Sequence, residues 1–164
     1  METLRFCLIG AGRAGMVHAR NLVHHIENAR LAAIVDSDGK VLAERGEELG
    51  VKGLFTGLDE ALDADLFDAV IIVTPTFTHR DLVVACARAG KHIFCEKPMS
   101  ITVAEARDMN RAVLEAGVKL QIGFMRRFDP PFVRAHELID EGSLGEVVIV
   151  KSVGRGPGLP PPWT

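Results

Sequence analysis

The sequence predicts an α/β fold in which helices cover both faces of a doubly wound parallel sheet. Short apolar runs of strand-forming residues alternate with segments whose apolar residues recur every three or four positions, and this alternation is typical of parallel sheets. A turn rich in glycine joins the first apolar run to the first helical segment. The chain has 164 residues, of which 48% are hydrophobic, so a full core can form without disulfides or a structural metal.

The first strand and helix units occupy residues 4–62. The run at 4–9 is short, mainly apolar and stopped by Gly10, which predicts a strand buried on both faces. Apolar residues from Met16 to Ile26 follow helical spacing, and Gly50 stands where a helix is expected to end. We expect strands at 4–9, 31–35 and 53–55, and helices at 16–26, 39–49 and 58–62.

The next units carry strong local signals. Four of the five residues at 69–73 are β-branched, which predicts a strand, and the turn Thr74-Pro75-Thr76 follows it. Thr102 and Glu105 match a capping box, in which each side chain satisfies a backbone amide at a helix start. Asp129 stands before two prolines and is expected to cap the helix that they open. We expect strands at 69–73, 92–95 and 120–123, and helices at 78–89, 102–116 and 130–141.

One more apolar run, EVVIVKSV, lies at 146–153 with no helical pattern behind it. A single strand does not fold alone. We therefore expect this run to be the first strand of a truncated α+β second domain. The predicted organisation is a first domain at 1–145 and an incomplete second domain at 146–164.

Charge and cysteine content narrow the classes of function. Lys and Arg number 19 against 22 Asp and Glu, a net charge of −3, without a block of like charge, which argues against binding nucleic acid or a membrane surface. Cys7, Cys86 and Cys95 form no C-x-x-C pair and are expected to be small buried residues. The N-terminal apolar stretch is too short for a signal peptide or a membrane span. We expect a cytoplasmic protein whose partner is a small molecule or another protein.

A G-x-G-x-x-G pattern runs from Gly10 to Gly15. The pattern alone is weak, but here it leaves a predicted strand and opens a predicted helix, as dinucleotide binding requires. Gly10 allows the tight turn, Gly12 lets the backbone approach a pyrophosphate, and Gly15 permits close packing of helix on strand. The N-terminus of the helix that follows offers free amides and a positive dipole end to that anion. Arg13 and Ala14, within the pattern, are also expected cofactor-binding residues, and Arg13 either adds positive charge there or faces solvent. The first domain is therefore expected to be a Rossmann domain that binds a dinucleotide.

Asp36 ends the second predicted strand, 21 positions after Gly15. Its carboxylate can accept hydrogen bonds from the adenosine ribose hydroxyls of NAD and would repel the additional phosphate of NADP. Ser37, Asp38 and Gly39 follow it, with no arginine to hold that phosphate. NAD is therefore the expected cofactor, and NADP is less favoured.

Glu96-Lys97-Pro98 follows the strand expected at 92–95. It lies at the carboxyl end of the sheet, where open α/β folds bind ligands. The proline restricts Lys97 to an extended conformation and makes a cis peptide bond possible, so the lysine can be aimed reproducibly. Such a lysine can hydrogen-bond a substrate hydroxyl. A surface lysine in a turn is the alternative that the local sequence leaves open.

Five motifs in series give the chain a family resemblance. They lie at 10–15 with Asp36, 74–79, 96–98, 123–130 and 142–147. Together they resemble the Gfo/Idh/MocA family of NAD(P)-dependent oxidoreductases, which includes glucose-fructose oxidoreductase and inositol dehydrogenases. The resemblance spans almost the whole chain, and motifs in the right order are far more specific than the glycine pattern alone.

The resemblance implies roles for individual residues. Four residues are implied to line the cofactor groove near the nicotinamide half, namely Thr74, Pro75, His79 and Glu96. Glu96 would contact the ribose. Lys97 would be the catalytic lysine, and Arg127 would lie near the nicotinamide or the substrate. By local sequence alone, His79 is as easily a residue at a helix start, and Arg127 a solvated charge. The tail is similar to inositol-dehydrogenase-like members, which favours a polyol or sugar substrate.

Family members are longer, and their second half supplies most of the substrate pocket and the Asp and His that complete proton transfer with the lysine. The first hypothesis is an oxidoreductase that moves a hydride between a polyol or sugar hydroxyl carbon and nicotinamide. The second is a non-catalytic NAD-binding fragment, and the third is a methyltransferase, in which 96–98 has no role. A chain with no tyrosine is not a short-chain dehydrogenase. We expect little or no turnover from the 164 residues alone, no metal site, and a homo-oligomer that associates through 146–153.

Overall fold

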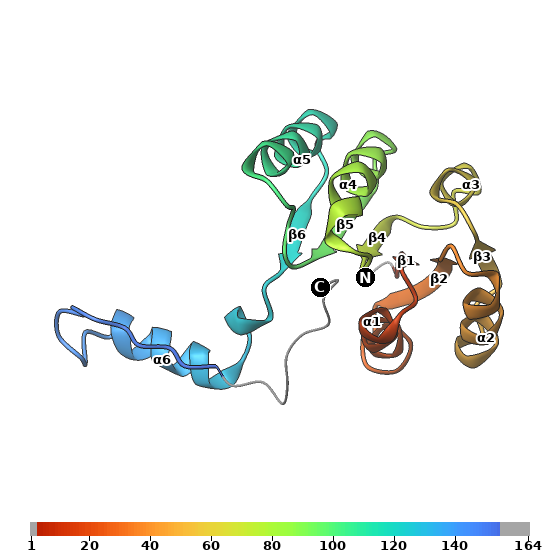
Figure 1. The fold of residues 1–164 in the computed structure, drawn as a ribbon. Helices are drawn as coiled ribbons and strands as arrows, with labels where there is room; N and C mark the ends of the chain where they lie inside the picture. Colours follow the sequence, from red (N-terminus) through yellow and green to blue (C-terminus); the bar gives the residue numbers. More distant parts are fainter. Residues whose placement is uncertain (1–2, 155–164) are drawn as a thin grey trace. The chain divides into compact units, whose positions relative to one another are not determined.

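The structure is a computed structural model that describes residues 3–154. The chain divides into two compact units, Met1–Gly123 and Phe124–Thr164. The first unit contains the whole sheet (Figure 1). The division between the units falls inside the first domain expected at 1–145, and the boundary at 145 stays a prediction.

The first unit is built on six parallel strands in the order β3-β2-β1-β4-β5-β6. The strands are β1 (Leu4–Ile9), β2 (Ala29–Val35), β3 (Gly53–Phe55), β4 (Ala69–Ile72), β5 (His92–Glu96) and β6 (Leu120–Gly123). One face carries α1 (Arg13–His24) and α2 (Gly39–Leu49), and the other carries α3 (Leu58–Asp63), α4 (His79–Arg88) and α5 (Val103–Ala116), as Figure 1 shows. The predicted doubly wound parallel sheet is confirmed. The strand order reverses beside β1, which is where folds of this kind bind ligands.

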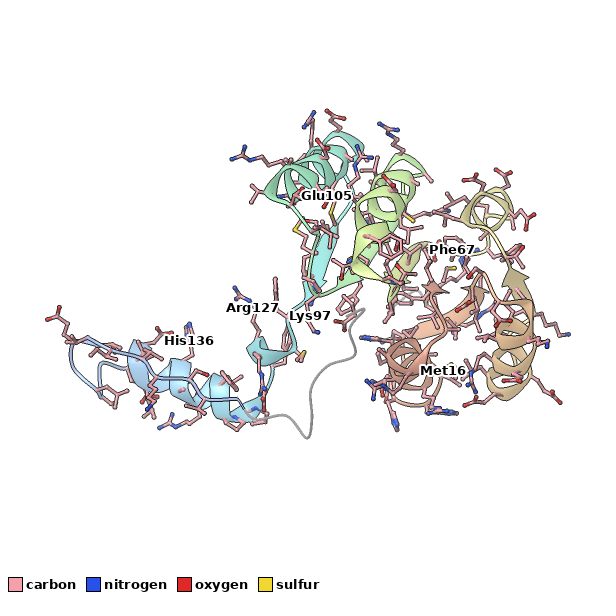
Figure 2. The ribbon with its side chains drawn as sticks, viewed as in Figure 1. Met16, Phe67, Lys97, Glu105, Arg127 and His136 are labelled. Atoms are coloured by element: carbon pink, nitrogen blue, oxygen red, sulfur yellow. The ribbon has the colours of Figure 1, made fainter. Side chains whose placement is uncertain are left out.

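Side chains alternate along the central strands between two cores, one on each face of the sheet. Cys7 and Ile9 of β1 belong to the core that contains Phe67, whereas Leu8 belongs to the core that contains Met16. Figure 2 shows Phe67 and Met16 among the helices of opposite faces. The period of two in a strand explains this alternation, and it confirms the prediction that the first strand is buried on both faces.

The three cysteines are free and fully buried. Burial raises the pKa of Cys86 and of Cys95 to about 12, so these thiols stay neutral and pack as small apolar groups. Among residues 3–154, no three His, Cys, Asp or Glu side chains gather as a metal ion would require. No helix in the same range is both long and apolar enough to cross a membrane.

Helix and strand ends follow the local sequence closely, and the largest differences lie at α1 and β2. Helix α1 begins at Arg13, three residues before the expected start at Met16. The capping box is confirmed, because Thr102 Oγ1 accepts from the Glu105 amide at 3.2 Å and a Glu105 carboxylate oxygen accepts from the Thr102 amide at 3.0 Å. Helix α1 ends at His24, so Ile26 lies beyond it and is 51% exposed. Strand β2 begins two residues earlier than expected because Ala29 pairs with Leu4 of β1.

Up to residue 154, the second unit contains a short 3-10 helix, η2 (Met125–Arg127), and one α-helix, α6 (Pro130–Asp140). The helix was expected, but Asp129 does not cap it with its side chain. The Asp129 carboxylate instead accepts from Arg126 Nη1 at 2.7 Å, because the arginine competes successfully for it.

The strand expected at 146–153 is wrong for this structure, since residues 146–154 form no regular secondary structure. Val148 and Ile149 are 83% and 84% exposed. A strand needs a hydrogen-bonded neighbour, and among the described residues the six strands of the sheet pair only with one another. Whether this segment opens a second domain stays a prediction.

Candidate functional site

In the glycine turn between β1 and α1, two glycines lie too close to backbone carbonyl oxygens to carry a side chain. Gly10 has φ 95°, and a Cβ there would lie 2.6 Å from the carbonyl oxygen of Val73. A Cβ on Gly15 would lie 2.0 Å from the carbonyl oxygen of Gly10. Both positions therefore require glycine, whereas a Cβ on Gly12 would meet nothing within 4 Å. Gly12 borders open space, which leaves room for a ligand to approach the backbone.

Helix α1 starts at this turn without a side-chain cap. Asp38 caps α2 and Thr102 caps α5, but α3, α4 and α6 also lack a side-chain cap, so the uncapped start of α1 is informative only together with the open space at Gly12. The first amides of an α-helix have no partner within the helix, and with the helix dipole they favour an anion. Arg13 and Ala14, in the first turn, are exposed. The open space at Gly12 and this uncapped helix start fit a pyrophosphate group.

The Asp36 carboxylate is held beside the turn by two backbone amides. Oδ2 accepts from the Ala11 amide at 2.8 Å, and Oδ1 accepts from the Asp38 amide at 3.0 Å. A carboxylate has about four acceptor sites, so Asp36 keeps sites for ligand hydroxyls while its orientation is fixed.

A pocket of about 530 Å³ lies at the carboxyl ends of β1, β2 and β4. The predicted site residues that line it are Gly10, Gly12, Asp36, Thr74 and Pro75. The structure therefore brings together residues that are up to 65 positions apart, 75 − 10. This is the switch point of the sheet, where ligands bind in folds of this class.

A second hollow of about 550 Å³ adjoins Gly12 and Asp36. Arg13 lines it, and so do Arg20 of α1 and Arg45 of α2. The last two were not predicted, because neither lies among the residues directly after Asp36. Glu48 pairs with both, at 2.6 Å from Arg20 Nη2 and 2.8 Å from Arg45 Nη1, and this ion pairing lowers the pKa of Glu48 through the two guanidinium groups. The positive charge near Asp36 is therefore partly neutralised.

His79 is buried, with 1% of its surface exposed. Its Nδ1 lies 2.9 Å from the Pro98 carbonyl oxygen and its Nε2 lies 2.9 Å from the Thr74 carbonyl oxygen. The imidazole thus connects the turn after β4 with the turn that carries Lys97. Both partners are acceptors, so a neutral ring, which has one N–H, donates to only one of them at a time. Its implied place along the cofactor groove stays a prediction.

Lys97 directly follows β5 and is exposed (Figure 2). The Lys97–Pro98 peptide bond is cis, the isomer that the sequence made possible. The Lys97 amide donates to Glu96 Oε2 at 3.0 Å, and Glu96 Oε1 contacts His18 Nε2 at 2.9 Å. No spacing signal in the sequence points to this contact, because His18 and Glu96 are 78 positions apart. Arg127 lies in the second unit, exposed within η2.

Residues 4–124 match the family model described as "Oxidoreductase family, NAD-binding Rossmann fold". The chain belongs to this family. The match covers most of the chain and confirms the Gfo/Idh/MocA resemblance that the five motifs indicated. At the level of the family, it also confirms the expected Rossmann fold and the expected NAD cofactor.

Among members of this family, the chain is 39% identical to the scyllo-inositol 2-dehydrogenase (NAD(+)) of Bacillus subtilis, covering 96% of the chain and 46% of that protein. It is 42% identical to the inositol 2-dehydrogenase of Rhizobium meliloti, covering 97% and 47%. The crystal structure of scyllo-inositol dehydrogenase from Lactobacillus casei with bound NAD(H) and scyllo-inositol matches with a TM-score of 0.85 at 33% identity, covering 88% of this chain and 43% of that one. The chain thus spans about half the length of the relatives it matches.

Proposed function

We propose that the chain is the NAD-binding part of an oxidoreductase that moves a hydride between a hydroxyl-bearing carbon of a polyol or sugar and nicotinamide. The observation that carries this proposal is the pocket at the switch point, where an open Gly12, an uncapped helix start and a fixed Asp36 carboxylate come together. The inositol dehydrogenases among its relatives support the substrate class.

In this proposal the cofactor residues divide by the part of NAD that they contact. The pyrophosphate lies against the first turn of α1, at Gly10, Gly12, Arg13, Ala14 and Gly15, and Asp36 accepts from the adenosine ribose. The nicotinamide half lies near Thr74, Pro75, His79 and Glu96. For Arg127, in the second unit, the family resemblance implies a place near the nicotinamide or the substrate. NAD supplies the hydride acceptor. Lys97 hydrogen-bonds the substrate hydroxyl and takes part in removing its proton as the carbonyl forms.

Calorimetric titration tests the proposal and its competitors. We expect NAD to bind and S-adenosylmethionine not to bind. Binding of S-adenosylmethionine in preference to NAD would support the methyltransferase alternative. The non-catalytic fragment is the second candidate, and the half-length match to the relatives favours it for this chain taken alone. We therefore propose that the 164 residues bind NAD with little or no turnover.

The buried free thiols support the cytoplasmic location that we propose.

NAD is expected to bind more tightly than NADP, because the Asp36 carboxylate accepts from ribose hydroxyls and repels a phosphate. Glu48 pairs with Arg20 and Arg45, two of the three arginines that line the adjacent hollow. Asp36→Ala should weaken NAD binding by about tenfold, because hydrogen bonds to a charged group are lost. The difference in affinity between NAD and NADP should therefore become smaller. Competition binding of the two cofactors measures this. Equal affinity of the unaltered chain for both would contradict the prediction.

Self-association through residues 146–153 is also proposed. The apolar side chains of this segment are exposed, among them Val148, Ile149 and Val150, and such a segment tends to recruit a second copy. Light scattering over a concentration series is expected to show a dimer. A chain that stops at Gly145 should be monomeric. A constant monomer mass of the full chain, or a dimer that survives the deletion, would rule out this interface.

A further inference from the structure

His18 and Glu96 join helix α1 to strand β5 through a half-buried contact. His18 Nε2 lies 2.9 Å from Glu96 Oε1, and the two side chains are 25% and 21% exposed. The imidazole also packs against the Phe94 ring, with ring centroids 5.3 Å apart. A carboxylate can only accept, so Nε2 is the nitrogen that carries the proton. The histidine is therefore fixed both by packing and by its hydrogen bond.

Gly123 makes room for this arrangement from the other side. It pairs with Glu96 in the register of β5 and β6. A Cβ on Gly123 would lie 3.0 Å from Glu96 Oε1 and 2.9 Å from Phe94 Cζ. A side chain at this position would displace the carboxylate or the ring, so glycine keeps the space that the Glu96 carboxylate occupies.

The Glu96 carboxylate still has acceptor capacity for a ligand. Oε1 accepts from His18, and Oε2 accepts from the Lys97 amide. A carboxylate offers about four acceptor sites, so sites remain for the hydroxyls of a sugar. The carboxylate is thus held between the helix that follows the glycine turn and the residue proposed to meet the substrate.

We propose that His18 is a positioning residue, which holds Glu96 in the orientation that accepts hydrogen bonds from the ribose on the nicotinamide side of NAD. This inference rests on the proposed function, in which Glu96 contacts that ribose. Helix α1 begins at the pyrophosphate position and β5 ends at the nicotinamide half, so the His18 contact fixes one half of the cofactor site relative to the other.

The affinities of three ligands distinguish this positioning role of His18 from a general structural role. ADP contains the adenosine and the pyrophosphate, ADP-ribose adds the second ribose, and NADH adds the nicotinamide. In the full chain, His18→Leu should weaken the binding of ADP-ribose and of NADH by about tenfold. Without His18, the Glu96 carboxylate is no longer oriented to accept from the ribose, and a hydrogen bond to a charged group is lost. ADP affinity should stay within about twofold, since the glycine turn and the Asp36 carboxylate are unaltered. Isothermal titration calorimetry measures all three affinities.

Two further variants complete the test. His18→Gln keeps an N–H donor and should restore NADH affinity. Gly123→Ala should displace the Glu96 carboxylate, or the Phe94 ring that packs on His18, and give the same loss confined to ADP-ribose and NADH. Equal weakening of all three ligands by His18→Leu, no weakening, or a loss that His18→Gln does not reverse would overturn the inference. If the unaltered chain binds neither ADP nor NADH, the proposed function itself fails, and the two failures are distinguishable.

Discussion

Gly15→Ala is expected to destabilise the first unit severely, whereas Gly12→Ala is expected to leave it folded and lose NAD binding. A Cβ on Gly15 would lie 2.0 Å from the Gly10 carbonyl oxygen, and this atom belongs to the backbone, so no side-chain rotation can relieve the clash. Overpacking of this kind costs about 3 kcal/mol or more. A Cβ on Gly12 meets nothing within 4 Å, but its methyl group would occupy the space proposed for the pyrophosphate.

Thermal unfolding by circular dichroism and calorimetric titration with NAD measure the two effects separately. The melting temperature should fall by roughly 6 °C or more for Gly15→Ala and stay within about a degree for Gly12→Ala. NAD affinity should fall at least about tenfold for Gly12→Ala, since the amides of the first turn no longer reach the anion. Each variant serves as the control for the other. Unchanged NAD affinity in Gly12→Ala would contradict the assignment of the pyrophosphate position.

Most strands of the sheet were predictable because the residues within or next to each strand indicate it. The run 69–73 is nearly all β-branched, and the glycine turn marks both the end of β1 and the start of α1. The capping box located the start of α5 for the same reason, since its hydrogen bonds join residues three positions apart. Local signals of this kind depend on few neighbours and are therefore readable from sequence.

Contacts across the fold were not predictable from the residues that make them. His18 and Glu96 are 78 positions apart, and the link of His79 to Pro98 runs from a helix start to the next strand end. Glu48 holds two arginines that come from different helices. The strand expected at 146–153 shows the converse error, because β-branched residues favour a strand only where a neighbouring edge accepts its hydrogen bonds.

The chain is expected to bind NAD but to produce no measurable NADH from myo-inositol or scyllo-inositol. Oxidation of a hydroxyl-bearing carbon releases a hydride to NAD and a proton to a base, and Lys97 is the only proton-handling group that the family resemblance assigns within these residues. Each general acid or base raises a reaction rate by about 10²- to 10⁴-fold. Where several such groups act as a unit, removing some of them removes most of the rate enhancement. Lys97 is also exposed to solvent, so water competes with a substrate hydroxyl for hydrogen bonds to its side-chain nitrogen.

Absorbance of NADH under saturating NAD and polyol measures the rate, with the inositol 2-dehydrogenase of Rhizobium meliloti as the active reference. The rate of the 164-residue chain should be lower by at least about 10³-fold. Fusion of the chain to the unmatched second half of that relative should raise the rate, and Lys97→Ala in the fusion should abolish the gain. Steady NADH production by the unfused chain that Lys97→Ala abolishes would show instead that these residues hold a complete proton-transfer site.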